Sequence, residues 1–217
     1  MALRILPFRQ YNEHNVVNLY ALDSTATIPG DLATEGDGDA GILVKIKNGD
    51  FDKGIDFDFS NTAGSNGAYL GETNYPHVAR NGYPQVTGMT FEPTSESTPG
   101  TMLGITLRQT ATHDENGEKL LYYRQKAIEH QAVLPGEVVP VLTAGLVTLA
   151  ASAFDTSTAD LAVGATLGAG DDGTLKVGGT GVGRVLATGS RTAGNTADQF
   201  AGAAGSSAAY ALVKIEL

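Results

Sequence analysis

The sequence contains neither cysteine nor tryptophan, and it is poor in positive charge. Without cysteine, no disulfide framework and no thiolate metal site can form, so stability must come from packing, hydrogen bonding and assembly. The 217 residues include 14 Lys and Arg against 24 Asp and Glu, a formal net charge of −10 at pH 7. Binding to a phosphate backbone requires a basic surface. We therefore expect no nucleic-acid partner.

Long apolar runs are also missing. The longest, around residues 141–154, is too short for a membrane-spanning helix and is interrupted by polar residues. Near the N-terminus, Pro7 and Arg9 follow directly after a few apolar residues, so no secretory leader is predicted. We expect a protein without a membrane partner, made and used in a cytoplasm unless it leaves inside a larger particle.

What the sequence does contain is a series of short strand patterns. Apolar and polar residues alternate over residues 42–47, 55–59, 105–108 and 211–217, and a return strand is predicted to begin at residues 121–125. A period of two is typical of strands that bury one face, and Gly, Asn and Asp turns lie between these segments. The pattern predicts an all-β fold, a small barrel or β-sandwich, with an N-terminal arm and an additional β region.

Three regions are predicted along the chain. Residues 1–30 form an N-terminal arm or edge segment, residues 31–100 an N-terminal β region with a long loop, and residues 101–217 a C-terminal β-barrel module. The boundary at residue 100 is predicted from the polar, proline-bounded segment 92–100. Residues 1–20 have two open interpretations: a contact arm outside the barrel, or the first strand of the chain's own sheet.

The segment Gly168-x-Gly170-x-x-Gly173 formally matches a dinucleotide-binding fingerprint. That fingerprint has its meaning where a strand leads into a helix whose N-terminus faces a phosphate. Here the intervening residues are Asp171 and Asp172, whose carboxylates would repel a phosphate, and a short strand pattern follows instead of a helix. We predict a hairpin turn between two strands, and no nucleotide cofactor.

No motif for catalysis or metal binding is recognisable. The four histidines form no metal-binding pair, and a serine-nucleophile motif is absent. The acidic segments 35–39 and 50–58 could offer oxygen ligands to calcium, but they lack the full EF-hand spacing. The preferred interpretation is a solvated turn and an acidic strand face. We expect no enzymatic activity, no cofactor and no metal site.

Two groups of side chains are candidates for surface contacts. One is a set of three tyrosines in the Gly-, Asn- and Pro-rich stretch 61–88, which could line a protein interface or stack on a sugar. An interface is preferred because no paired carboxylates or tryptophan accompany them. The other group lies near the N-terminus and combines two arginines with aromatic residues. The candidate contact residues are Arg4, Phe8, Arg9, Tyr11, Tyr69, Tyr75 and Tyr83.

The C-terminal half carries a succession of strands and turns that resembles a known family. The succession is Leu134-Pro-Gly-Glu-Val-Val-Pro-Val141, Gly145-Leu-Val-Thr-Leu149, Ala165-Thr-Leu167, the Asp/Gly turn before Thr174-Leu-Lys-Val177, Val182-Gly-Arg-Val-Leu-Ala187 and Tyr210-Ala-Leu-Val-Lys-Ile-Glu-Leu217. This order resembles the small β-barrel capsid decoration, or cement, proteins of tailed bacteriophages. The resemblance covers about residues 100–217, whereas residues 1–100 depart from the short members of the family.

The resemblance implies a function, a location and partners. It implies a structural virion protein, synthesised in the host cytoplasm, that binds the outside of a phage capsid and cements neighbouring capsid subunits. The implied partners are the major capsid protein and further copies of the chain, most simply in a homotrimer. The alternatives are a phage tail or fibre component that binds a host surface carbohydrate, and a glycan hydrolase with two carboxylates converging from separate strands.

Overall fold

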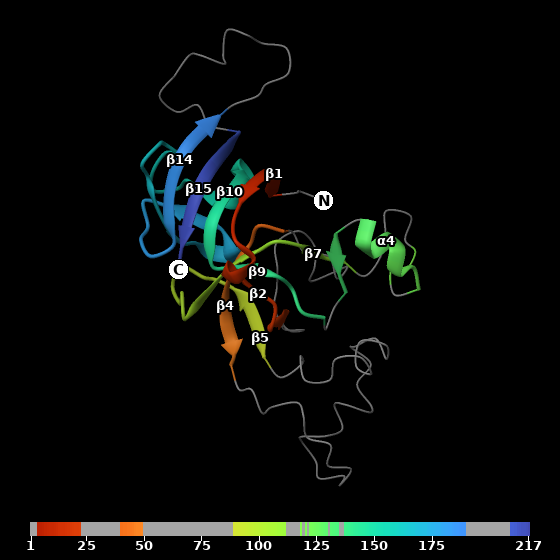
Figure 1. Ribbon diagram of the computed structural model, residues 1–217. Coiled ribbons are helices and arrows are strands. Elements are labelled where there is room, and N and C mark those ends of the chain that lie inside the picture. Colours follow the sequence, from red (N-terminus) through yellow and green to blue (C-terminus); the bar gives the residue numbers. More distant parts are fainter. Residues whose placement is uncertain are drawn as a thin grey trace.

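The computed structural model is built mainly from β-strands, which confirms the predicted all-β class (Figure 1). The strand predicted at residues 55–59 and the acidic segments 35–39 and 50–58 lie outside the residues that the structure describes. The described residues are 4–22, 40–49, 89–111, 118, 120, 122–129, 131–134, 137–189 and 209–217.

A curled seven-stranded sheet forms the upper part of the molecule in Figure 1. Its order is β1-β10-β15-β14-β12-β13-β11. Neighbouring strands run antiparallel, except that β11 and β13 are parallel. The strands are β1 (Ile5–Gln10), β10 (Ala144–Ala150), β11 (Phe154–Asp155), β12 (Thr166–Ala169), β13 (Leu175–Val177), β14 (Gly183–Gly189) and β15 (Tyr210–Glu216).

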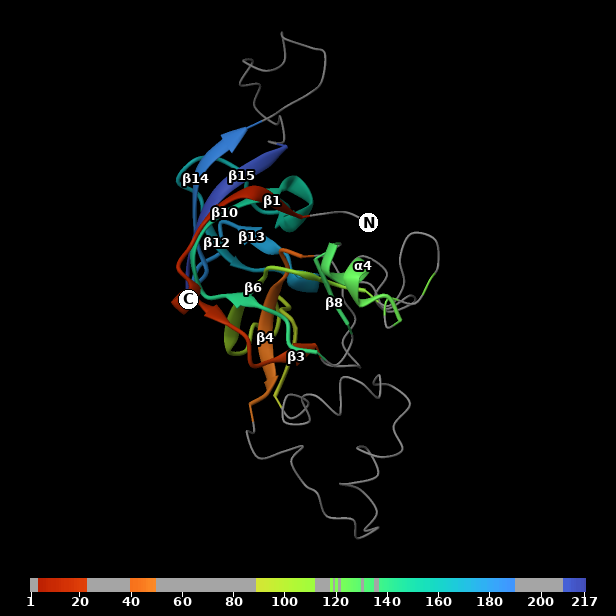
Figure 2. The same ribbon diagram turned by 45° about the vertical axis from the view of Figure 1, so that its right-hand side comes forward.

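A second sheet of six strands lies below the first, in the order β2-β9-β6-β4-β5-β3. Its strands are β2 (Val16–Val17), β3 (Ala21–Leu22), β4 (Leu43–Asn48), β5 (Thr90–Pro93), β6 (Met102–Thr106) and β9 (Val141–Leu142). Beside it stands a small unit of two parallel strands and one helix (Figure 2). That unit contains β7 (Gln109–Thr110), α4 (Arg124–Glu129) and β8 (Ala132–Val133).

The two large sheets share one hydrophobic core. Leu43 and Ile105 of the six-stranded sheet pack in the same cluster as Leu149 and Val213 of the seven-stranded sheet, and all four side chains are fully buried. The opposite face of the six-stranded sheet packs into a second cluster, which includes Phe91. The six-stranded sheet is therefore apolar on both faces, and this explains why neighbouring residues along its strands are buried together.

The strands predicted by alternation at residues 42–47, 105–108 and 211–217 are found close to their expected positions, as β4, β6 and β15. In β15, Ala211, Val213 and Ile215 are fully buried, and the strand pairs on one side with β10 and on the other with β14. Leu217 follows the strand and is 41% exposed. The period of two thus identified even a strand in the middle of a sheet.

The return strand predicted to begin at residues 121–125 is wrong, because the chain forms helix α4 there. Two side chains that would share one face of such a strand, Tyr123 and Gln125, are both exposed. Instead Ala127 is buried in a small cluster with Leu120 and Leu134, separate from the two larger cores. Gln, Lys, Ala and Glu favour helix, and this local preference prevails where the segment does not join a large sheet.

The Gly-Asp-Asp-Gly turn is confirmed. Asp171–Gly173 forms a 3₁₀ turn, η4, between the antiparallel strands β12 and β13, and no helix follows. Asp172 has φ 55° and Gly173 has φ 68°, so both adopt the left-handed conformation that turns require and that Gly and Asp tolerate. The glycine fingerprint is therefore part of a hairpin.

The predicted boundary near residue 100 does not separate two sheets. Strands β4 and β5, from one side of it, pair with each other, and β4 also pairs with β6 from the other side. The polar segment after β5 is held against turn η4 of the upper sheet: Gly173 N–H donates to the Thr94 carbonyl (3.0 Å), and Glu96 N–H donates to Asp171 Oδ1 (2.8 Å). The segment 92–100, which the sequence predicts to be a boundary, is therefore hydrogen-bonded to the other sheet and connects the two.

Candidate functional site

Strand β1 lies at one edge of the seven-stranded sheet in the described part of the chain, with β11 at the other edge, and its pairing with β10 contains a bulge. Ile5 pairs with Leu149 and Arg9 with Val147, so β1 advances four residues while β10 advances two. The extra residues include Pro7 and Phe8, and the Phe8 side chain is 66% exposed. A bulge that contains proline prevents regular strand pairing along an outer edge, while it leaves an aromatic side chain on the surface.

Of the two interpretations of residues 1–20, the structure shows the second: residues 5–10 are a strand of the chain's own sheet. Among the predicted contact residues, Phe8 lies on the surface, Arg9 and Tyr11 are half-buried and Arg4 is buried. Arg4 precedes the strand, and its carbonyl accepts from Ala150 N–H (2.7 Å). Phe8, Arg9 and Tyr11 are thus brought to one border of the sheet. Tyr69, Tyr75 and Tyr83 lie outside the described residues.

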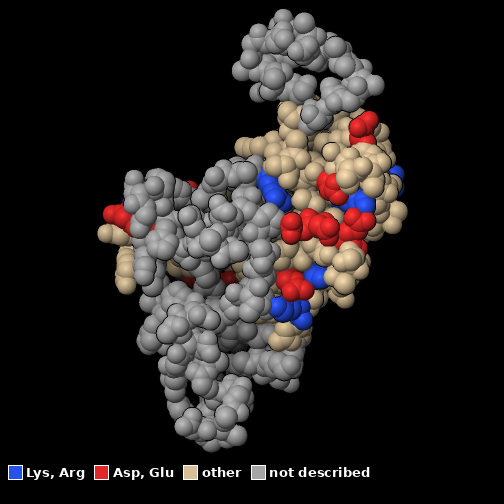
Figure 3. All heavy atoms as spheres, turned by 180° about the vertical axis from the view of Figure 1, so that it is seen from behind, with Lys and Arg blue, Asp and Glu red and all other residues tan. Residues whose placement is uncertain are grey.

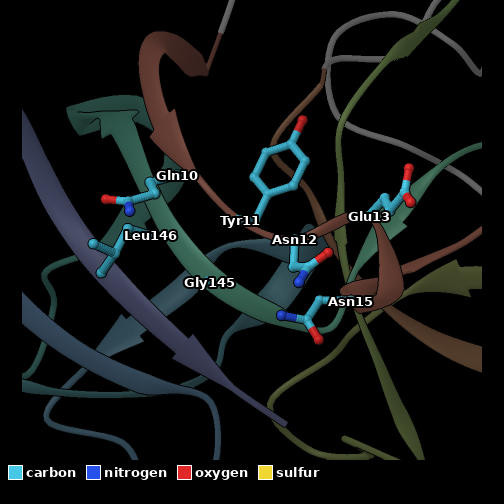
Figure 4. A pocket seen from close by; sticks show the side chains of 7 residues that line it. All are labelled: Gln10, Tyr11, Asn12, Glu13, Asn15, Gly145 and Leu146. Atoms are coloured by element: carbon cyan, nitrogen blue, oxygen red, sulfur yellow. The ribbon is translucent and has the colours of Figure 1, made fainter.

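An open hollow lies where β1 ends and β10 begins. Figure 4 shows Tyr11 between Gln10 and Leu146 on one side and three polar side chains on the other. We name this feature the Tyr11 hollow. It is lined by Gln10, Tyr11, Asn12, Glu13, Asn15, Gly145 and Leu146. It combines an aromatic ring with amides and one carboxylate, a set that can both donate and accept hydrogen bonds.

The backbone of the Tyr11 hollow is fixed by several hydrogen bonds. Glu13–Asn15 forms a 3₁₀ turn, η1, in which Asn15 N–H donates to the Asn12 carbonyl (3.0 Å). The Asn15 carbonyl in turn accepts from the backbone N–H of Thr143 (2.8 Å) and from its hydroxyl (3.0 Å). Strand β2, which follows the turn, pairs with β9. The polar side chains are therefore carried by a turn anchored at both ends.

Gly145 allows the two walls of the hollow to approach each other. Its φ is 148°, and a Cβ atom added there would lie 2.6 Å from Tyr11 Cβ and 3.2 Å from the Gln10 carbonyl oxygen. A side chain at this position would displace Tyr11. Because Gly145 has no side chain, Tyr11 lies directly against β10. One part of Tyr11 therefore packs against the main core, and another part lines the hollow.

Charged side chains on the face seen in Figure 3 lie in groups of both signs. Lys45 and Lys47 pair with Glu92 at 3.4 and 3.5 Å, and Lys176 pairs with Glu96. Most of these pairs join neighbouring strands or fasten the segment after β5 to β13, so they serve the fold. These pairs lie at the surface with partly covered side chains, and surface ion pairs contribute little free energy individually.

The surroundings of Asp155 in the sheet favour its charged form. The backbone N–H of Ser157 donates to Asp155 Oδ1 (2.9 Å), and this bond, with a further one from the Ser157 side chain and the charge of Lys176, holds the pKa of Asp155 below its ordinary value. Asp155 belongs to β11, at the far side of the sheet from β1. Its role is therefore local: it fixes the turn that follows β11.

The described residues contain neither a cluster of metal-binding side chains nor a helix able to span a membrane. No group of three His, Cys, Asp or Glu side chains is arranged to hold a metal ion among them. Within the same part of the chain, no helix has the length and apolar character needed to cross a membrane.

Most residues of the Tyr11 hollow were missed by sequence reasoning, which identified Tyr11 alone. A signal was present in the polar run Asn12-Glu13-His14-Asn15 after a strand pattern, because asparagine favours turn and cap positions. Gly145, however, lies more than a hundred residues away in sequence. Its approach to Tyr11 follows from the pairing of β1 with β10, which no local pattern reveals.

Comparison of the chain with protein-family models, with curated proteins and with solved structures found no match.

Proposed function

We propose that the chain is a structural virion protein that binds the outside of a phage capsid and cements neighbouring capsid subunits. The observation that carries the proposal is the arrangement of the segments that resemble the cement proteins. The resembling segments within residues 145–217 supply β10, β12, β13, β14 and β15, which lie together in one curled sheet, whereas the first segment, residues 134–141, leads into β9 of the six-stranded sheet. A cement protein requires such a rigid small β body.

The border of the sheet at β1 is the surface we assign to the capsid contact. Phe8 is exposed there on the bulge, and Arg9 lies one residue further along the same strand. Aromatic and arginine side chains contribute much of the binding energy at protein interfaces, because they combine large contact areas with polar groups. Function would then be distributed over a surface, as expected for a shell-stabilising protein.

The test is the copy number in purified phage particles that carry the gene for this chain. The chain is quantified by mass spectrometry against the major capsid protein. A cement protein is expected in hundreds of copies per particle. A few copies per particle would favour the alternative of a tail or fibre component, and absence from the particle would contradict both.

The contact surface is tested on capsids from particles that lack the gene. Added wild-type protein is expected to co-sediment with these capsids, and Phe8→Ala is expected to weaken binding at least tenfold, in the range of interface hot spots. Val163→Ala is the matched control, because Val163 is 65% exposed but belongs to a loop far from β1 in sequence. Equal binding of both variants would show that β1 is not the contact surface.

Self-association belongs to the same proposal. Closed symmetry lets each subunit use one surface repeatedly, and a homotrimer fits the resemblance. Sedimentation equilibrium of the purified protein is expected to give three times the mass of one chain, which is 22.4 kDa. A monomer in solution at high concentration and on the particle would show that the trimer is wrong, while the copy-number test would still decide the cement function.

A further inference from the structure

We propose that the Tyr11 hollow binds a neutral saccharide. The inference goes beyond capsid cementing and does not depend on it, because the hollow lies at the end of β1 and is formed with η1 and β10, whereas the bulge with Phe8 lies within β1. It names a ligand class for the residues that line the hollow, of which Tyr11 is also one of the contact residues predicted from the sequence.

The chemistry of the lining matches that of a sugar ring. A pyranose presents an apolar C–H face and a rim of hydroxyl groups that both donate and accept hydrogen bonds. Tyr11 offers a flat apolar ring with a polar tip, and Leu146 adds apolar surface next to Gln10, at the other side of the hollow. Gln10, Asn12 and Asn15 carry amides, each with two N–H donors and one acceptor oxygen, so they can satisfy hydroxyls of either orientation.

The charge of the hollow selects among saccharides. Glu13 is the one charged residue among the seven that line it, and the whole chain has a formal net charge of −10. A sulfated, phosphorylated or sialylated sugar would meet like charge there, at short range and from the surrounding protein. A neutral sugar would instead offer hydroxyl donors to the Glu13 carboxylate, which is a strong acceptor.

The fixed backbone makes binding possible in an open site. Turn η1 is held by the Asn12 cap and by the two bonds from Thr143 to the Asn15 carbonyl, so ordering of the loop adds little cost on binding. The hollow is shallow, however, and leaves much of a ligand in water. We therefore expect a weak complex between one chain and a short oligosaccharide, with a Kd on the order of 1 mM. Many copies of the chain on one particle would bind a multivalent glycan more tightly than a single copy does.

The experiment is titration of the full chain with four neutral probes, followed by amide NMR. The probes are maltotriose, cellotriose, mannotriose and tri-N-acetylchitotriose, and a heparin tetrasaccharide is the anionic comparison. We expect saturable shifts at residues 10–15 and 145–146 with at least one neutral probe, and none with heparin. Absence of saturation with all four neutral probes up to about ten times the expected Kd, or binding of heparin alone, would overturn the proposal.

Two variants locate the site. Tyr11→Ala is expected to weaken binding about tenfold or more, corresponding to about 1.4 kcal/mol. Because Tyr11 also packs against the main core, the double variant Gln10→Ala with Glu13→Ala is tested as well; it removes polar partners that are both exposed and keeps the ring. Tyr122→Ala is the matched control, since Tyr122 is 75% exposed on the α4 unit. Unchanged binding in both hollow variants would overturn the assignment, and copy number on particles would be unaffected either way.

Discussion

Gly173 shows how a single residue joins the two sheets. Its φ of 68° is strained for any residue with a side chain, and an added Cβ atom would lie 2.9 Å from the Leu43 carbonyl oxygen, in addition to a clash with Ile42. The turn η4 can therefore approach β4 only with glycine at this position. Gly173 is the last glycine of the segment that formally matches a nucleotide-binding fingerprint. Its close packing against β4 accounts for the glycine at this position without any nucleotide.

We expect Gly173→Ala to lower the free energy of unfolding by about 2–5 kcal/mol, the sum of backbone strain and overpacking. Gly164→Ala is the control, because Gly164 has a similar φ of 87° but an added Cβ would meet nothing within 4 Å. That variant should lose about 1–2 kcal/mol from strain alone. Urea unfolding measures both, and equal losses would show that the contact between η4 and β4 is unimportant.

Asp155 provides a pH-dependent contribution to stability. Its pKa is lowered in the folded state, mainly by the hydrogen bond from Ser157 N–H, so the charged form is favoured by folding. A group of this kind stabilises the fold fully above its ordinary pKa of 3.8, and the contribution is lost as the pH falls from that value through the lower folded-state pKa.

We therefore expect Asp155→Asn to be less stable than wild type at pH 6 and to approach the wild-type stability as the pH falls below 3.8. Thermal unfolding of both proteins between pH 2.5 and 7 measures the difference. Asp160→Asn, an exposed carboxylate later in the same loop, is the comparison. A stability difference for Asp155→Asn that stays constant over this range would contradict the linkage.

At the scale of elements, strand β1 contributes one side chain to the main core and exposes another on the surface. Ile5 is 5% exposed and packs in the main core, whereas Phe8 stands on the bulge. We expect Ile5→Ala to lower the free energy of unfolding by about 2–4 kcal/mol, and Phe8→Ala to change it by no more than about 0.5 kcal/mol. Chemical denaturation distinguishes them.

Deletion of residues 1–11 tests the same point more severely. The deletion removes Ile5, the pairing with β10 and the contact of Tyr11 with the core, so we expect the truncated chain to fail to fold. A truncated protein that folds with wild-type stability would show that β1 is only loosely added to the sheet, as an arm would be.

The elements that sequence reasoning predicted are those with strong local signals. Strand β15 alternates in burial, the alternating sequence pattern at residues 42–47 coincides with most of β4, and the turn at Asp171 and Asp172 is rich in residues that tolerate left-handed backbone; the pattern at residues 105–108 overlaps only the end of β6. Helix α4 was missed because Tyr123 and Gln125 happened to continue a period of two, although neither is buried. In a six-residue helix, too few turns are present for the helical period to outweigh such a coincidence.

The candidate site was less predictable than the elements. Tyr11 and Phe8 were singled out as aromatic residues in a segment without a local partner, but their partner strand β10 begins at Ala144. Which polar side chains gather around Tyr11 depends on that long-range pairing and on Gly145. The sequence thus indicates that aromatic side chains take part in a surface contact. The shape of the Tyr11 hollow, however, depends on the register of two strands that lie far apart in the chain.

At the scale of the whole molecule, the shared core makes the two large sheets one folding unit despite the predicted boundary. Leu43 of β4 is fully buried among side chains of the upper sheet, and Asp171 of the upper sheet accepts from Glu96 N–H and from the Ser95 hydroxyl (3.0 Å) after β5. Elements that share a core and hydrogen bonds in this way lose their stability together.

We expect Leu43→Ala to lower the opening free energy of amides in β4 and in β15 by the same amount, about 2–5 kcal/mol. Native-state hydrogen exchange measures both strands in one experiment. Tyr122→Ala, on the separate α4 unit, should leave both unchanged. If Leu43→Ala weakened β4 while β15 kept its protection, the two sheets would unfold independently despite their shared core. An equal loss of opening free energy in β4 and β15 would mean that the two sheets open together. Binding of a partner at β1, which belongs to the same sheet as β15, would then also stabilise the six-stranded sheet through the shared core.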